Sequence, residues 1–216
     1  MLDFSKKIIN IIYKKMFNHN KKLCYLVYPK SGSSSMRDYL PSKGFAQPLG
    51  RWGHTDMKHI EQYAQLHKIN LDEYTFFSTF RDPISHFISC YNWTQNDPKW
   101  NGGISGTNIK INSPNDYLNY LENRKYKWND LHPYLFSQYK NFFRGINNKV
   151  KNVLMLDLKP ETLQKFCKKY GIEYSPLPHS NKTIKKNSIN LNDNEIKRIH
   201  KLYESNENYI KNHLFI

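Results

Sequence analysis

The chain has 216 residues, enough to bury a proper hydrophobic core, and we expect residues 1–216 to form a single domain. Its content of 16 Tyr, 12 Phe and 4 Trp excludes a disordered tail. The formal net charge of +15 predicts affinity for anions such as nucleotides, nucleic acid, anionic glycans or acidic membranes. A solvated basic surface without any partner explains the same charge.

The N-terminal segment, MLDFSKKIINIIYKKMF, is basic and predicts a helical extension over residues 1–20. Its apolar run is too short to span a membrane, and it lacks a small-residue cleavage site. We expect this helix to pack on the domain, with peripheral contact to a membrane surface as the alternative. The sequence leaves the cellular location open, with the cytoplasm as the default. It also leaves open whether a membrane anchor has been removed.

Hydrophobic patterning predicts strands that alternate with helices. In chain order, the first half has a strand at 23–28, a helix at 34–40, a short strand at 45–46, a helix capped by Thr55, a strand at 74–80 and a helix from Pro83. The second half has a long loop at 95–113, helices from Pro114 and around 135–143, a strand at 153–158, a helix at 160–170 and a last helix from Asn192, with Glu195 completing a capping box. This order implies an α/β fold with a mostly parallel central sheet flanked by helices.

The three cysteines, Cys24, Cys90 and Cys167, lie in apolar stretches without the spacing of metal ligands. We therefore expect small core residues and no bound metal.

Residues 26–40, LVYPKSGSSSMRDYL, mark a candidate anion site. A strand, a glycine-containing turn and a helix start leave backbone N–H groups pointing at a ligand. Gly32 allows a close backbone approach, Lys30 adds a positive charge, and hydroxyls come from Ser31, Ser33, Ser34 and Ser35. A serine-rich turn with an ordinary helix cap is the alternative. Because Lys30 precedes the glycine, the GxxxxGK[ST] order of nucleoside triphosphatases is absent, and the loop need not bring a magnesium ion.

Residues 80–92, FRDPISHFISCYN, mark a second candidate. Arg81 follows a strand at the carboxyl edge of the sheet, where ligands of α/β proteins bind, and Ser89 lies less than two turns into the next helix. A guanidinium and a hydroxyl placed there are suited to hold a phosphate. A local pair between Arg81 and Asp82 is the alternative for the arginine.

The PKSGSSS segment resembles the phosphosulfate loop of sulfotransferases, P-K-[ST]-G-[ST]-[ST], and FRDPISHFISCYN resembles their second nucleotide motif. Weaker likeness continues through HPYLFSQY, VLMLDL with PETLQKFCKKYGI, and LPHSNKTIKK. The pattern is nearer to the carbohydrate sulfotransferases of heparan or chondroitin type than to the cytosolic small-molecule ones. One departure is His86, where many members carry Arg.

The resemblance implies a P-loop-like three-layer fold and transfer of a sulfuryl group from 3′-phosphoadenosine 5′-phosphosulfate (PAPS) to an acceptor hydroxyl, without a metal. Lys30 would stabilise charge on the bridging oxygen, and Arg81 and Ser89 would hold the 3′-phosphate. The residues implied for the 5′-phosphate are Ser31, Gly32, Ser33, Ser34 and Ser35, and Lys182 and Thr183 would complete the nucleotide site. The expected acceptor is a glycan or another anionic, extended substrate, not a nucleic acid.

The acceptor hydroxyl needs a general base, and His54 is the leading candidate. It lies 27 residues before Arg81, roughly where some glycan sulfotransferases carry their catalytic histidine. Imidazole titrates near neutral pH, so it can accept a proton there. Asp56 and Glu61 are the rivals, and His132 is a weaker candidate.

Two other functions remain as alternatives. A nucleotide-dependent kinase-like P-loop enzyme requires a magnesium-binding carboxylate after a strand, which Asp157 could imitate. A non-catalytic polyanion-binding module fits the charge of +15 but does not explain the spacing of Arg81 and Ser89.

Overall fold

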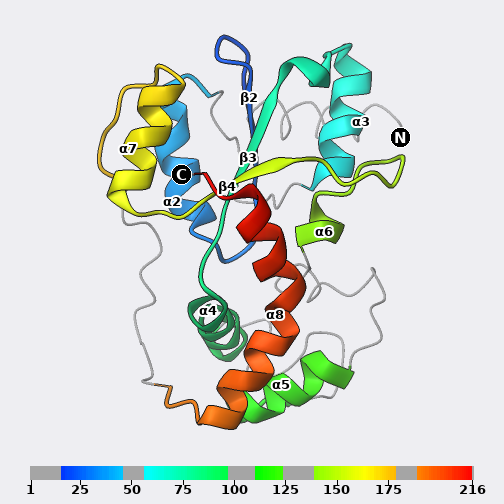
Figure 1. Cartoon of the computed structure of the whole chain (residues 1–216), viewed down its shortest axis with the longest axis vertical. Coiled ribbons are helices and arrows are strands. Elements are labelled where there is room, and N and C mark those ends of the chain that lie inside the picture. The colour runs from blue at the N-terminus through cyan, green and yellow to red at the C-terminus, as the bar shows by residue number, and fades with distance from the viewer. Residues whose placement is uncertain (1–15, 46–55, 97–109, 124–138, 179–188, 216) are drawn as a thin grey trace.

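The computed structural model of the protein describes residues 16–45, 56–96, 110–123, 139–178 and 189–215, which are drawn as ribbons in Figure 1. A four-stranded sheet in the order β1-β2-β3-β4 forms its centre. The strands are β1 (Phe17–Asn18), β2 (Leu23–Leu26), β3 (Thr75–Thr79) and β4 (Val153–Leu156). β2, β3 and β4 are parallel and β1 is antiparallel to β2, so the predicted mostly parallel sheet is confirmed.

Helices lie on both sides of this sheet. They are α2 (Ser33–Tyr39), α3 (Met57–His67), α4 (Pro83–Asn96), α5 (Pro114–Asn123), α6 (Tyr139–Phe142), α7 (Pro160–Lys169) and α8 (Asp193–His213), with short 3-10 turns at Leu40–Lys43 and Leu71–Glu73. Figure 1 shows α2 and α7 on one side of the sheet and α3 and α6 on the other. The chain therefore has the α/β architecture that its sequence predicts.

The parallel strands form because their side chains are buried on both faces. All four residues of β2 are buried, and so are four of the five in β3, which is why each reads as a continuous apolar run. Leu26 at the end of β2 pairs with Ser78 in β3. Since parallel strands end at the same edge of a sheet, the segments after β2 and after β3 leave the sheet next to each other.

A second hydrophobic cluster lies beyond this edge and joins α4, α5 and α8. Its buried members include Phe87, Tyr117, Leu118, Ile199 and Tyr203. The C-terminal end of α8 returns to the sheet, where the amide of Phe215 donates to the carbonyl of Met155 at 3.0 Å. Helix α8 thus connects the sheet to the helical cluster that supports α4 (Figure 1).

Three local predictions were wrong. Phe17–Asn18 is a strand paired with β2 inside the predicted helical extension, whose residues 1–15 lie outside the described part of the chain. Phe45 lies in a buried bend after a 3-10 turn and is not part of a strand. Helix α3 is capped by Asp56, because the Asp56 carboxylate accepts a hydrogen bond from the His59 amide, whereas Thr55 was the expected cap.

Other predictions stand within the described residues. Cys24, Cys90 and Cys167 are buried thiols, as expected of core residues. The helix expected around residues 135–143 is described from Tyr139 to Phe142. No helix in the described part of the chain is both long and apolar enough to cross a membrane.

Candidate functional site

The loop between β2 and α2 has the backbone of an anion-binding turn. Lys30 has a φ of 58° and Gly32 a φ of 87°, so both residues have a left-handed backbone conformation. Left-handed residues within a turn make successive N–H groups converge on one concavity. A Cβ atom on Gly32 would lie only 2.1 Å from Leu158 Cδ1. The left-handed φ therefore favours glycine at this position, and a side chain there would also require the Leu158 side chain to move. Since α2 has just seven residues, the loop amides and the Lys30 ammonium supply positive potential here in addition to the helix dipole.

The serines of this loop are not equivalent. Ser31 is fully buried, and its hydroxyl donates to the carbonyl of Tyr28 at 2.8 Å and contacts Thr79 Oγ1 at 3.0 Å. The Ser34 hydroxyl accepts from Arg37 Nη2 at 3.1 Å. Ser31 can therefore offer a ligand its backbone amide, while its hydroxyl holds the loop itself.

Lys30 projects toward α4, the helix that carries the second motif. Its Nζ atom lies 5.9 Å from the centroid of the Trp93 ring, within the range of a cation–π contact. Trp93 lies one turn beyond Ser89 on α4, and Ser89 is half-buried. The lysine of the first motif and the serine of the second thus belong to the same region of the molecule.

Arg81 lies in the short link between β3 and α4 and is exposed. Its neighbour Asp82 caps α4, because the Asp82 carboxylate accepts from the Ser85 amide at 2.8 Å. The cap explains the acidic residue of the RDP sequence. The arginine stands at the carboxyl edge of the sheet, as its place in the sequence predicts.

His86, the departure from the family pattern, joins the two motifs. It is buried, and its Nε2 must donate to the carbonyl of Pro29 at 3.0 Å, because a carbonyl only accepts. Its Nδ1 therefore accepts from the Tyr203 hydroxyl at 2.5 Å. Burial, aided by the charges of Arg81 and Lys30, lowers the pKa of His86 to about 4, although the bond to Pro29 opposes the shift. A neutral imidazole thus holds the backbone directly before Lys30. Sequence reasoning missed this role, because the Pro29 contact is 57 residues away along the chain.

The candidate bases fall into two groups. His54 and His132 lie outside the described residues, as do Lys182 and Thr183. Asp56 Oδ1 is bonded to the His59 amide at 3.0 Å and to His59 Nδ1 at 2.6 Å, a contact that raises the pKa of His59. Glu61 accepts from the Ile146 amide in the turn after α6 at 2.5 Å. Both rival carboxylates therefore have structural partners.

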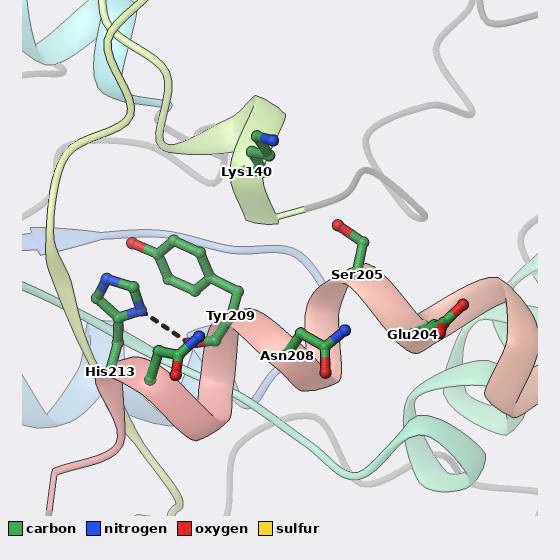
Figure 2. Close-up of a pocket in the computed structure, with 7 residues that line it drawn as sticks. Lys140, Glu204, Ser205, Asn208, Tyr209 and His213 are labelled. Carbon is green, nitrogen blue, oxygen red and sulfur yellow. Dashed lines mark hydrogen bonds between the residues drawn. The ribbon is translucent and has the colours of Figure 1, made fainter.

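A cavity of about 430 Å³ between α6 and α8 is separate from these residues. Figure 2 shows Lys140 of α6 above the α8 side chains that line it, with the His213 ring bonded to the Tyr209 carbonyl at 2.8 Å. None of its lining residues belongs to either motif. Within the stretches that the structure describes, no group of three or more His, Cys, Asp or Glu residues is arranged to hold a metal ion.

The fold and these two motifs define an α/β protein with a candidate anion-binding loop at the carboxyl edge of a parallel sheet. A model of the sulfotransferase family matches residues 14–215, and the chain belongs to that family. Membership makes it a transferase and implies use of PAPS and a hydroxyl acceptor. The match does not single out the carbohydrate type. No curated protein and no solved structure matches the chain significantly.

Proposed function

We propose that this protein transfers a sulfuryl group from PAPS to a carbohydrate hydroxyl by in-line displacement. The left-handed loop with Lys30 beside α4 carries the proposal, because it gathers amides and an ammonium at one point of the sheet edge. The φ of 87° at Gly32 supports it further, since a left-handed glycine lets the backbone of the loop approach a ligand closely.

The loop holds the 5′ end of the donor in this proposal. The backbone amides from Ser31 onward and the hydroxyls of Ser33, Ser34 and Ser35 bind the 5′-phosphate, and Lys30 stabilises the charge that develops on the bridging oxygen. PAPS supplies the sulfuryl group, whose bond to that oxygen breaks as the acceptor oxygen bonds to sulfur. Positioning and charge stabilisation account for most of the rate in such displacements.

Arg81 and Ser89 hold the 3′-phosphate, with Lys182 and Thr183 completing the site. Arg81 is exposed at the strand end and is accessible to a ligand. A charge-assisted bond from a guanidinium to phosphate is among the stronger contacts in proteins. Arg81→Ala should therefore weaken binding of the product, 3′-phosphoadenosine 5′-phosphate, by about 2 kcal/mol, or roughly thirtyfold. Isothermal calorimetry measures this, and unchanged affinity would remove Arg81 from the site.

His54 acts as the base that takes the proton from the acceptor hydroxyl. Asp56 is hydrogen-bonded to His59, and Glu61 is hydrogen-bonded to the Ile146 amide. These bonds support the choice of His54 over either carboxylate. We expect His54→Ala to keep nucleotide affinity and lose transfer. Loss of both would indicate a structural role for the histidine.

The acceptor class rests on the resemblance to carbohydrate sulfotransferases and on the charge of +15, which favours an anionic, extended chain. A screen of glycans, tyrosine peptides and small alcohols with radiolabelled PAPS tests it. Sulfation of a small alcohol in preference to every glycan would overturn the carbohydrate assignment.

One thermal-shift experiment tests the site as a whole. We expect 3′-phosphoadenosine 5′-phosphate to raise the melting temperature of the wild type but not that of Lys30→Ala, since a ligand stabilises only the state that binds it. ATP with magnesium would stabilise a kinase-like enzyme instead. Stabilisation by heparin alone would favour the polyanion-binding module.

A further inference from the structure

Three buried hydroxyls connect β2, β3 and the anion-binding loop. Tyr25 Oη lies 3.0 Å from Thr79 Oγ1, and Thr79 Oγ1 lies 3.0 Å from Ser31 Oγ. Ser31 Oγ lies 2.8 Å from the carbonyl oxygen of Tyr28. All three hydroxyl residues are 0% exposed, so water does not compete for these bonds.

The direction of the chain of bonds follows from its last member. The Tyr28 carbonyl accepts only, so Ser31 must donate to it and has no second proton to give. Thr79 must then donate to Ser31, and Tyr25 must donate to Thr79. Burial raises the pKa of Tyr25, which keeps the phenol protonated as the donor. The Thr79 hydroxyl is therefore both the acceptor for Tyr25 and the donor to Ser31, and its loss removes both bonds.

Thr79 occupies the middle of this chain and is the last residue of β3, two residues before Arg81. Its partner Ser31 lies between the two left-handed residues of the loop, Lys30 and Gly32. A left-handed conformation costs a non-glycine residue about 1–2 kcal/mol, so Lys30 needs neighbouring contacts to retain it. The Thr79–Ser31 bond joins this loop to β3.

We propose that Thr79 is a positioning residue, which fixes the Lys30 loop against the strand that leads to Arg81. It touches neither phosphate in the proposed function, on which this inference rests, and acts through Ser31. Its hydroxyl sets both the conformation of Lys30 and the spacing between the two halves of the nucleotide site.

Hydrogen exchange of the ligand-free protein tests the positioning role of Thr79 without assuming any activity. Thr79→Val keeps the side-chain shape but loses both hydrogen bonds. We therefore expect at least about tenfold faster exchange of the Tyr28 and Met36 amides, which donate to the carbonyls of Leu26 and Gly32 at the two ends of the loop. Thr79→Ser restores the hydroxyl and should restore the wild-type rate. Ser78→Ala is the matched control, because Ser78 is equally buried on β3 but donates to Leu26, before the loop begins. Should Thr79→Val fail to fold, Ser31→Ala breaks the same bond from the loop side.

Calorimetry with 3′-phosphoadenosine 5′-phosphate then measures the consequence for binding. We expect about tenfold weaker affinity in Thr79→Val and less than about threefold change in Thr79→Ser and Ser78→Ala. Unchanged loop exchange in a folded Thr79→Val protein, or equal effects of Thr79→Val and Ser78→Ala, would overturn the positioning role. Faster loop exchange in Thr79→Val, together with no nucleotide binding by the wild type, would overturn the proposed function and leave the positioning role of Thr79 intact.

Discussion

Gly32 shows how far one residue determines the site. Its φ of 87° disfavours any side chain, and a Cβ atom at this position would lie 2.1 Å from Leu158 Cδ1, so the Leu158 side chain would also have to move. We expect Gly32→Ala to lower the unfolding free energy by at least about 1–2 kcal/mol and to abolish binding of 3′-phosphoadenosine 5′-phosphate, measured by denaturation and calorimetry.

Gly44→Ala is the control for backbone strain. Gly44 has a similar φ of 82°, and a Cβ atom there would lie 3.1 Å from Asn18 Nδ2, away from the loop. The substitution should destabilise the protein and leave nucleotide affinity unchanged. Equal affinities of the two folded variants would show that the loop does not bind the nucleotide.

His86 makes the stability of the protein depend on pH. Its pKa is about 4 in the folded protein against an ordinary value of 6.5, so between these values the unfolded chain binds the extra proton. The stability contributed by a neutral His86 is therefore present above pH 6.5 and lost as the pH falls toward 4, by up to roughly 3 kcal/mol. The charged or titratable groups that act on the ring are Lys30, Arg81, Asp82, Cys90 and Tyr203.

Urea denaturation between about pH 4.5 and 8 checks this prediction. His86→Gln should flatten the loss of stability on acidification. His59 is the opposite case: Asp56 raises the pKa of His59 from 6.5, so its contribution is present below pH 6.5 and lost as the pH rises. Removing His59 should therefore steepen the rise of stability with pH. A His86→Gln profile parallel to that of the wild type would contradict a buried neutral imidazole.

Among the secondary-structure elements, α5 and α8 are joined by hydrogen bonds of Arg198 in addition to their apolar packing. Its guanidinium donates to both carboxylate oxygens of Glu122, at 2.8 and 2.6 Å. It also donates to Asn115 Oδ1 at 2.6 Å and to Asn119 Oδ1 at 2.7 Å. One side chain of α8 thus binds three residues on α5, and this pair of helices supports α4 through the second hydrophobic cluster.

Arg198→Lys should weaken this contact, because an ammonium cannot reproduce the planar fork. We expect about 1 kcal/mol of destabilisation, measured by thermal or urea unfolding. Affinity for 3′-phosphoadenosine 5′-phosphate should not change, since Arg198 lies outside both motifs. A parallel loss of affinity would mean that the position of α4 at the site depends on α5.

For the whole molecule, the net charge of +15 and the local site should respond differently to salt. Long-range attraction of a polyanion is screened beyond roughly 8–10 Å at physiological ionic strength, whereas contacts within a loop are screened less. Raising NaCl to about 0.5 M should abolish stabilisation by heparin and largely preserve stabilisation by the adenosine bisphosphate. Thermal shifts measure both, and equal salt sensitivity would point to binding of both ligands by the general basic surface.

Local pattern in the sequence was enough to predict the α/β architecture and the family. Apolar runs and turn residues act within a few positions of one another, so β2, β3, β4 and most helices are where the sequence places them. The capping box of α8 is confirmed for the same reason, with Asn192 and Glu195 bonded reciprocally at 2.9 and 3.0 Å. The loop at Gly32 and the RDP link were recognisable because their chemistry lies in consecutive residues.

Contacts between distant residues were beyond such reasoning. Thr79 meets Ser31 across 48 residues, and His86 meets Tyr203 across 117. Asp56 and Glu61 are candidate bases in the sequence, which gives no sign of the partners, His59 and Ile146, that the folded chain supplies. Pairing of Phe17–Asn18 with β2 likewise overrides the helical pattern around it. Hydrogen bonds of buried side chains depend on which elements meet, and only packing of the complete chain determines that.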